Sequence, residues 1–381
     1  MKKLLYITDQ QEYAENGAII AVFHHYLKKY LDVNVVYFTK FKHSFQKKGD
    51  DFVVPLQHRK DLFSYLEHQG IAMGEYDYIL VRNMYDLLKQ VLRHRSKYGY
   101  KVGFRVSIPQ TTQVYEVEKL RQKNPLYAKM RHLLHNYLRR RLINQCDIFL
   151  PNSKTMREIF YPHITTEIYP LRPGLDPARV EPYLHTTGED VTFIYAGTID
   201  AINRFEVILE AFAKLEATNW QLHISTQNPD FIRALLEKFP QIASKVKLQS
   251  ALSLEELMEQ IRVCDVGIAL FPQIPIHEST IPAKVMEYYT CCMPALLNDN
   301  AKNRTLFKDG ENAFLTDFDV ERIREKLAQL ISTPPEMMAK VGEAGQKRIL
   351  GMARNYETMS RNFYERLEAL EPGNHNRHRS T

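Results

Sequence analysis

Short runs of β-branched and aromatic residues alternate with longer segments of helical periodicity along most of the chain. This alternation is typical of parallel α/β units, in which each strand is followed by a helix. In the first half we expect strands at 3–8, 33–38, 76–81, 100–107, 146–151 and 166–171, and helices at 18–31, 58–69, 84–96 and about 124–144.

The same alternation starts again after residue 190. Strands are expected at 191–197, 220–225, 246–249, 266–271 and 294–298, with helices at about 204–217, 230–239, 254–262 and 283–291. Helices at 319–332 and 335–370 close the pattern. Between the halves, LRPGLDPARVEPYLHTTGED (171–190) holds three prolines and two glycines, which marks a linker.

These patterns predict an α/β protein with two doubly wound, Rossmann-like domains that face each other across a cleft. A chain of 381 residues is long for a single core, and in such sheets ligands bind at the carboxyl ends of the strands. The predicted parts are an N-terminal domain (1–172), a linker (173–190), a C-terminal domain (191–355), a helix crossing back to the first domain (356–371) and a disordered tail (372–381).

Charge is divided unevenly between the halves. Residues 1–150 carry 25 Lys+Arg and 14 Asp+Glu (net +11), and the remainder carries 26 and 31 (net −5). An anionic substrate, an anionic membrane surface or nucleic acid would each suit a basic first half. We expect no nucleic acid, since the basic residues follow no known motif and the acidic half opposes a long groove.

Composition favours a cytoplasmic protein. Hydrophobic residues make up 44% and charged residues 25%, which are globular proportions. No run reaches the roughly 18 apolar residues that span a bilayer, and the N-terminus does not resemble a signal peptide. The four cysteines have no CxxC spacing, so we expect them to be reduced and buried.

The segment IPAKVMEYYTCCMPALL (281–297) is the first candidate for chemistry. A helix beginning near Pro282 leaves the N–H groups of Ala283 and Lys284 free for a phosphate. One turn later, Glu287 can accept hydrogen bonds from a diol such as ribose. The alternative is an exposed Lys–Glu pair, which the surrounding apolar residues disfavour.

The second candidate is YAGTIDAINRFEVILEAF (195–212). A strand ending at Gly197, a turn and a helix starting near Arg204 would make an anion site, because free N–H groups and the helix dipole face the ligand. Arg204 can add a charge-assisted bond to phosphate. A plain glycine turn beside a surface arginine is the alternative.

Together these segments resemble family 4 retaining glycosyltransferases of the GT-B fold. P-x-K-x-x-E-Y-x-x-x-x-x-P (282–294) is similar to the donor-binding segment of that family. CDIFLPNS (146–153), RPGLD (172–176) and SLEELMEQIRVCDVGIAL (253–270) resemble its other motifs in the same order, so the resemblance covers about residues 1–365.

The resemblance implies phosphate contacts at Arg204, at Lys284 and at the backbone of Ala283. Gly197 and Thr198 stand where the family has glycine and a phosphate-binding arginine, so Thr198 is a departure and Arg204 is left to bind the diphosphate. On this basis Arg204 and Lys284 are the predicted catalytic residues.

The resemblance also implies a ribose contact at Glu287 and a sugar contact eight residues earlier. That earlier position holds Ser279 in place of the family's glutamate, with Glu278 one residue before it. Either residue is a candidate for the sugar contact.

In the first domain, ENGAII (15–20) resembles the family's glycine loop through Asn16 and Gly17. Many family members have a histidine after the fifth strand. FRVSIPQ (104–110) has none, so Arg105 and Ser107 are candidate replacements. His24 and His25 are interpreted as ordinary helix residues.

Two further segments allow alternative interpretations. DFD (317–319) matches a D-x-D metal motif, but a helix N-cap explains it, and we expect no essential metal or other cofactor. Residues 129–145 pair Leu133, Leu134, Tyr137, Leu138 and Leu142 with Arg139–Arg141. This basic amphipathic helix suits either an anionic membrane surface or packing against the core.

The predicted function is retaining transfer of a sugar from a nucleotide-diphosphate sugar to a glycan or lipid-linked acceptor, in bacterial surface polysaccharide assembly. The enzyme would be cytoplasmic, with peripheral contact to the inner face of the membrane. Two alternatives remain: a sugar-nucleotide epimerase of the same fold, and a non-catalytic nucleotide-sugar-binding relative in a polymer-assembling complex.

Overall fold

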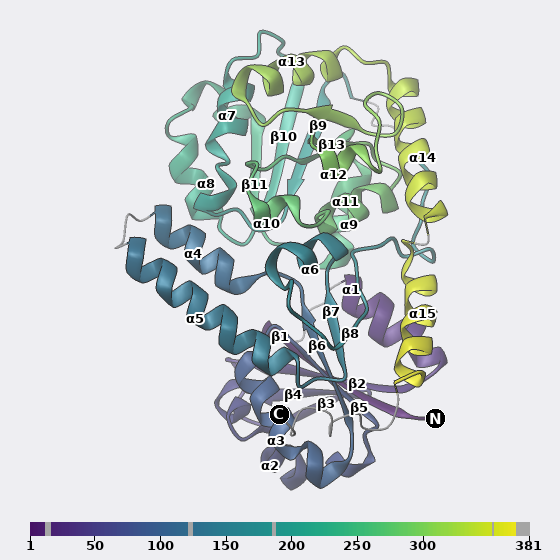
Figure 1. Ribbon diagram of the computed structural model, residues 1–381. Helices are drawn as coiled ribbons and strands as arrows, with labels where there is room; N and C mark the ends of the chain where they lie inside the picture. The colour runs from purple at the N-terminus through teal and green to yellow at the C-terminus, as the bar shows by residue number, and fades with distance from the viewer. Residues whose placement is uncertain (12–16, 121–124, 185–187, 353, 371–381) are drawn as a thin grey trace.

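Two parallel sheets, one from each half of the chain, form the framework of the protein (Figure 1). The computed structural model describes residues 1–11, 17–120, 125–184, 188–352 and 354–370. The predicted α/β architecture with two doubly wound sheets is confirmed.

The first sheet has the strand order β3-β4-β2-β1-β5-β6-β7-β8, and all neighbours are parallel except β3 and β4. Its strands are β1 (Lys3–Gln11), β2 (Asp32–Thr39), β3 (Gln46–Lys48), β4 (Asp51–Pro55), β5 (Tyr78–Arg82), β6 (Lys101–Val106), β7 (Ile148–Pro151) and β8 (Glu167–Ile168). Its longer helices are α2 (Leu62–His68), α3 (Tyr85–Tyr98), α4 (Gln110–Leu120), α5 (Pro125–Ile143) and α6 (Lys154–Phe160).

The second sheet is parallel throughout, in the order β11-β10-β9-β12-β13-β14. Its strands are β9 (Val191–Ala196), β10 (Trp220–Thr226), β11 (Val246–Ser250), β12 (Val266–Ala269), β13 (Ala295–Asn298) and β14 (Phe314–Thr316). Its α-helices are α7 (Glu206–Ala213), α8 (Pro229–Leu236), α9 (Leu254–Arg262), α10 (Pro275–Glu278), α11 (Ala283–Thr290), α12 (Ala301–Arg304), α13 (Val320–Ile331) and α14 (Pro335–Gly351).

Several differences from prediction lie in the first half. Strands β3 and β4 and helices α4 and α6 were not predicted, and the strand expected at 166–171 is reduced to β8. The helix expected at 18–31 is irregular: α1 (Gly17–Ile19) continues as a π-helical stretch (Ile20–Tyr26) and a 3-10 turn (Leu27–Lys29). The four cysteines are free and buried, as predicted.

The helix predicted at 335–370 is two helices, α14 and α15 (Tyr356–Glu368). Between them the chain pairs with the linker: Leu175 N donates to Arg354 O (2.9 Å) and Tyr356 N donates to Leu175 O (2.8 Å). Those hydrogen bonds replace helical ones, and the Asn355 side chain caps α15 by accepting from Thr358 N.

Helix α15 completes the core of the first sheet. Its buried side chains Tyr356, Met359, Phe363 and Leu367 pack against residues of β1, β2 and the helix after β1. Each fully buried side chain of this size contributes about 1.5–3 kcal/mol to folding. The C-terminal end of the described chain is therefore structurally part of the first half (Figure 1).

Helix α14 offers a matched test of its packing against the end of α11. A Cβ at Gly342 would lie 1.9 Å from the Cys292 carbonyl oxygen, whereas a Cβ at Gly351, on the same helix, would have nothing within 4 Å. We expect Gly342→Ala to lower the free energy of unfolding by about 1–3 kcal/mol through overpacking. Gly351→Ala should raise it by up to about 1 kcal/mol. Denaturant unfolding measures both, and equal effects would contradict the close approach.

Candidate functional site

Gly197 and Lys284, which are far apart in sequence, meet at the carboxyl ends of the paired strands β9 and β12. Gly197 follows β9 with φ of +126°, a conformation that favours glycine. A Cβ at this position would lie 3.3 Å from Cε and Nζ of Lys284. The two predicted phosphate-binding segments therefore contribute to one site.

The amine of Lys284 is buried and forms no ion pair within 4.0 Å in the described structure. Its Nζ is inaccessible to solvent and has no hydrogen-bond partner in the described structure, although part of the residue remains exposed. It lies 3.3 Å from the centroid of the Tyr195 ring and 5.1 Å from that of Phe271. Burial lowers the pKa of Lys284 well below its ordinary value, while the nearby Glu287 acts in the opposite direction. Cation–π contact offsets only part of the lost hydration.

Glu287 lies one turn further along α11. Burial raises the pKa of its carboxyl group, and the charge of Lys284 opposes this shift. The neighbouring Val285, Met286, Tyr288 and Tyr289 are all buried. The interpretation of Lys284 and Glu287 as an exposed ion pair is therefore wrong, because α11 has little solvated face here.

His277 adds a polar group that the sequence did not reveal. Its ring centroid lies 4.9 Å from that of Phe271, and its buried Nε2 has no hydrogen-bond partner. Burial, with the charges of Lys302 and Lys284, lowers its pKa to about 4, so the ring is neutral at pH 7. An unpaired ring nitrogen beside an unpaired ammonium is suited to a ligand that both accepts and donates hydrogen bonds.

Arg204 is placed differently from the prediction. Helix α7 begins at Glu206, and Arg204 precedes it with a left-handed φ of 48°. Its side chain is 59% exposed, and Nε lies 3.5 Å from Glu206. Thr198 is also exposed. Lys284 is therefore the buried cation of this site, whereas the side chain of Arg204 is exposed to solvent.

The residues just before α11 are partly used within the fold. Ser279 is buried, and its hydroxyl donates to the Ile276 carbonyl (2.8 Å), while its own carbonyl accepts from the Ser153 hydroxyl. Ala283, the first residue of α11, is exposed. Glu278 ends α10 and lines a cavity with Ser279. The Ser279 hydroxyl is therefore engaged by its own loop.

At the carboxyl edge of the first sheet, the two candidate residues belong to polar contacts. Arg105 is 6% exposed; its Nη1 donates to the Tyr6 hydroxyl (3.1 Å), and its Nε has no partner in the described structure. The Ser107 hydroxyl accepts from Asn83 Nδ2 (2.6 Å), and Ser107 N donates to Asn83 Oδ1 (2.9 Å). Asn83 has a positive φ of 56°, and such strain clusters at functional sites.

Asp9 and Arg82 extend this polar edge and were also missed. Arg82 Nη1 lies 3.4 Å from Asp9 Oδ1, and Asn83 Nδ2 donates to Asp9 Oδ2 (2.9 Å). Their positions in the sequence could have identified them, because each directly follows a predicted strand.

Only part of the predicted glycine loop lies within the described residues. Asn16 lies outside the described residues. Gly17 begins α1, and a Cβ on it would lie 3.6 Å from Leu254 of α9, so this helix approaches the second domain. As interpreted, His24 and His25 are helix residues; His24 Nε2 lies 2.8 Å from Asp51.

The D-x-D segment is explained by capping. The Asp319 carboxylate accepts from Glu321 N (3.0 Å) and Arg322 N (3.1 Å) at the start of α13. This is the N-cap arrangement that the sequence suggested.

The second half of the chain is similar to a known protein family. Residues 184–348 match the family model described as Glycosyl transferases group 1. The match covers less than half of the chain and includes Gly197, Lys284 and Glu287. A search of curated proteins finds no match.

Solved structures share the whole architecture. Sucrose-phosphate synthase from Thermosynechococcus elongatus superposes with a TM-score of 0.73 at 13% identity, covering 97% of this chain and 100% of its own. HepE of Anabaena, in complex with UDP and glucose, gives 0.69 at 13% identity, with 97% and 100% coverage. A UDP-forming trehalose-phosphate synthase from Burkholderia xenovorans gives 0.68 at 12%, with 96% and 100%. The fold is GT-B, as expected.

The buried ammonium makes a prediction about the unliganded protein. Lysine has an ordinary pKa near 10.4 when unfolded, and in the fold it is lowered. At a pH between the folded-state and unfolded-state pKa values of Lys284, the unfolded protein binds more protons than the folded protein. The free energy of unfolding therefore rises with pH over this range, and the buried amine lowers it at neutral pH. Lys284→Met should raise the free energy of unfolding by about 1–4 kcal/mol at pH 7, because it removes the desolvation cost of a buried amine.

The matched control is Lys326→Met in the same domain. The Lys326 side chain is also largely buried, with 14% of its surface exposed, but its Nζ pairs with the Asp309 carboxylate at 2.8 Å. Its replacement should leave stability unchanged or lower it, as measured by thermal and urea unfolding. A loss of stability in Lys284→Met at pH 7 would contradict the description of Lys284 as an uncompensated cation.

Proposed function

We propose that this protein is a retaining glycosyltransferase. It would transfer a sugar from a nucleotide-diphosphate sugar to a glycan or lipid-linked acceptor in bacterial surface polysaccharide assembly. The family match of residues 184–348 supports a glycosyl-transfer reaction. Among the structural neighbours, HepE is described in complex with UDP-glucose and the trehalose-phosphate synthase as UDP-forming, so UDP-sugars are the first donors to test.

The observation that carries this proposal is the unpaired ammonium of Lys284 beside Gly197. A diphosphate at this position would supply the missing counter-charge, and charge-assisted hydrogen bonds are strong where water is excluded. Glycine leaves room for the diphosphate to approach the backbone. As the bond to the sugar breaks, negative charge grows on the departing diphosphate, and a fixed cation stabilises that charge in the transition state.

Other residues take the remaining roles in the proposal. Glu287 would accept hydrogen bonds from ribose, and the backbone at Ala283 would donate to phosphate. Arg204 and Thr198, both exposed, would contact the diphosphate from the solvent side. His277 and Glu278 would face the donor sugar, with Ser279 contributing backbone groups because its hydroxyl is engaged.

The reaction would need no protein nucleophile. In transfer with retention on one face, a departing phosphate oxygen accepts the proton of the acceptor hydroxyl while that hydroxyl attacks the anomeric carbon. Positioning then supplies much of the rate enhancement. With Lys284 neutralising the diphosphate, we expect no essential metal. Arg105 and the Asp9–Arg82–Asn83 edge would bind the acceptor.

A transferase assay with a donor panel tests the proposal. Wild-type protein is incubated with UDP-, GDP-, ADP- and TDP-sugars, and nucleotide release is followed with and without candidate acceptors. Lys284→Ala should reduce turnover by about 10²–10³, the usual cost of removing one transition-state donor. Unchanged turnover would refute the role of Lys284. Donor binding without turnover would favour a non-catalytic binding relative, and interconversion of the sugar without transfer would favour an epimerase.

Donor affinity should also depend on pH. Because the pKa of Lys284 is lowered in the free protein and a phosphate would raise it, binding should take up one proton above the free-state pKa. Affinity should then fall by about tenfold per pH unit in that range. Calorimetry in buffers of different ionisation enthalpy measures the proton directly, and Lys284→Met should abolish the uptake.

Helix α5 supports the peripheral membrane contact within this proposal. Leu126, Tyr127, Met130, Leu133, Leu134, Tyr137 and Leu138 are each 49–68% exposed. Leu142 instead packs against the core, and Arg139 lies 4.3 Å from the Tyr85 ring. Exposed apolar side chains beside Lys129, Arg131 and Arg141 suit the surface of an anionic bilayer. In the described segments, no helix combines the length and apolar character that spanning a bilayer requires.

Vesicle binding tests this contact. Leu133→Glu/Leu134→Glu should weaken co-sedimentation with phosphatidylglycerol vesicles at least tenfold, because inserting each leucine contributes about 1.5–3 kcal/mol. Val263→Glu is the matched control, since Val263 is 57% exposed like both leucines but lies at the end of α9. Equal loss in the control, or wild-type binding that is the same on phosphatidylcholine, would contradict an α5-mediated contact with anionic lipid.

A further inference from the structure

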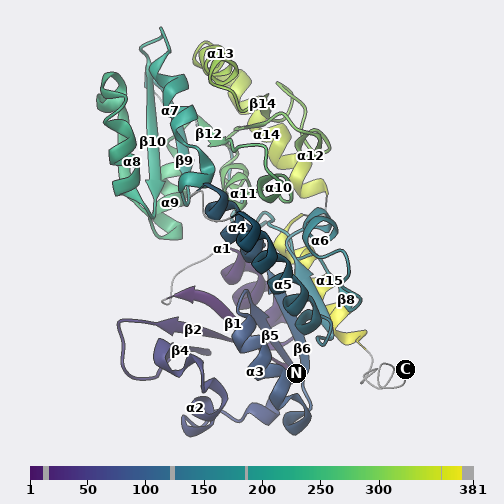
Figure 2. The same cartoon turned by 60° about the vertical axis from the view of Figure 1, so that its left-hand side comes forward.

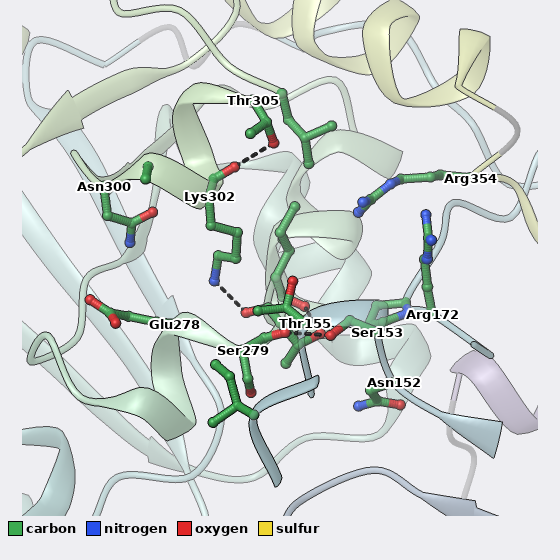
Figure 3. Close-up of a pocket in the computed structure, with 16 residues that line it drawn as sticks. Asn152, Ser153, Thr155, Arg172, Glu278, Ser279, Asn300, Lys302, Thr305 and Arg354 are labelled. Carbon is green, nitrogen blue, oxygen red and sulfur yellow. Dashed lines mark hydrogen bonds between the residues drawn. The ribbon is translucent and has the colours of Figure 1, made fainter. Parts of the chain in front are cut away.

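The cavity that Glu278 and Ser279 line lies where the two halves of the chain meet, and the proposed transfer reaction gives no role to its cationic side chains. It has a volume of about 480 Å³. Its walls come from the start of α6, the linker at Arg172 and Pro173, the loop 278–281, helix α12 and Arg354 between α14 and α15 (Figure 3). Gly197, Lys284 and Glu287 are not among its lining residues.

Charge in this cavity is unbalanced. Its lining contains three cationic side chains, Arg172, Lys302 and Arg354, but one carboxylate, Glu278. Lys302 is already bound, since its Nζ donates to the carbonyls of Thr280 (2.6 Å) and His277 (2.9 Å). The two arginines are the cations without such a role.

Neither guanidinium has a carboxylate partner in the described structure. Arg354 Nε is buried and makes no hydrogen bond. Burial, together with repulsion by the positive charge of Arg172, lowers the pKa of Arg354 to about 10. In Figure 3 both guanidinium groups lie on the side of the cavity away from Glu278.

Two other partly buried arginines, Arg262 and Arg95, are paired with carboxylates. Arg262 contacts both oxygens of Glu181 at 2.5 Å, and Arg95 contacts Asp147 at 2.5 Å. Two like charges placed together without a counterion are costly to keep partly buried. A dianion placed between two guanidinium groups can accept hydrogen bonds from both.

Neutral polar groups complete the cavity. Asn152 donates through Nδ2 to the Ser107 carbonyl (2.7 Å), while its buried Oδ1 is without a partner in the described structure. The side chains of Ser153, Thr155 and Thr305 also line the cavity. Hydroxyl and amide groups could therefore bind the remainder of a small phosphorylated molecule.

We propose that this cavity is an anion site for a phosphate group, free or carried by a small sugar phosphate, held by Arg172 and Arg354. It adjoins the proposed donor site and shares Glu278 and Ser279 with it, but Lys284 does not line it. Its ligand would contact the linker, the junction of α14 and α15, and segments of both domains at once, so binding would favour one arrangement of the domains.

The site would also act on the donor loop. Lys302 holds the carbonyls of Thr280 and His277, and Ser153 holds that of Ser279, on the segment that leads into α11. If phosphate changes nucleotide affinity through this segment, nucleotide must change phosphate affinity by the same factor.

Calorimetry and thermal shift test the site. Wild-type protein is titrated with sodium phosphate and with glucose 6-phosphate, against sodium chloride of equal ionic strength and against glucose. We expect saturable phosphate binding that raises Tm, and a Kd at least tenfold higher in Arg172→Gln and in Arg354→Gln. Tighter binding of glucose 6-phosphate than of phosphate would identify a sugar phosphate as the ligand, and equal Kd values would identify free phosphate.

Two control variants separate this site from the alternatives. Lys284→Met removes the donor-site cation, and Arg366→Gln removes an exposed arginine paired with Glu167 at 3.4 Å. Both should keep wild-type phosphate affinity. Without phosphate, Arg172→Gln and Arg354→Gln should be at least as stable as wild type, because one of two repelling charges is gone.

Three results would overturn the proposal. They are no saturable phosphate binding by the wild type, unchanged affinity in both arginine variants, or loss of binding in Lys284→Met, which would place the anion at the donor site. If Arg354→Gln does not fold, Arg172→Gln decides, since Arg172 lies on the linker outside any helix or strand.

Discussion

The backbone pairing of Leu175 with the segment 354–356 organises the junction of the two domains. Because Leu175 binds both Arg354 O and Tyr356 N, the chain passes between the domains twice at one place. Gly174 permits this approach, since a Cβ there would lie 2.5 Å from the Arg354 carbonyl oxygen. The same pairing ends α14 and directs α15 back along the first half of the chain (Figure 2). It also sets Arg354 near Arg172. Loss of this contact would disturb the first core and the junction cavity together.

Uncompensated buried cations are the common feature of the two sites. Lys284 lies against aromatic rings, and Arg354 faces another arginine. In each case desolvation lowers the pKa of the cationic side chain. An anion that binds there supplies the missing opposite charge, so its binding relieves the desolvation cost that the unliganded protein carries. Elsewhere in the fold, a partly buried arginine such as Arg262 is paired with a carboxylate, that of Glu181. Lys284 and Arg354 differ from Arg262 in this respect.

Sequence reasoning identified part of the candidate site for a clear physical reason. Gly197 and Lys284 follow strands that become neighbours in a parallel sheet, and the carboxyl ends of such strands share one edge. Helix α7 begins at Glu206, two residues later than predicted, because Arg204 has a left-handed backbone conformation. Tyr195, Phe271 and His277 were missed because aromatic residues in a strand or loop cannot be distinguished from core by pattern alone.

The sequence by itself determined the order and type of most helices and strands and the two-domain α/β architecture. These follow from local periodicity and from turn residues, which act over a few residues. Only the tertiary structure decided the break between α14 and α15, the burial of the Lys284 ammonium and the meeting of Arg172 with Arg354. Each depends on contacts between segments that are distant in sequence, where hydrogen bonding and desolvation outweigh the local helical preference of the chain.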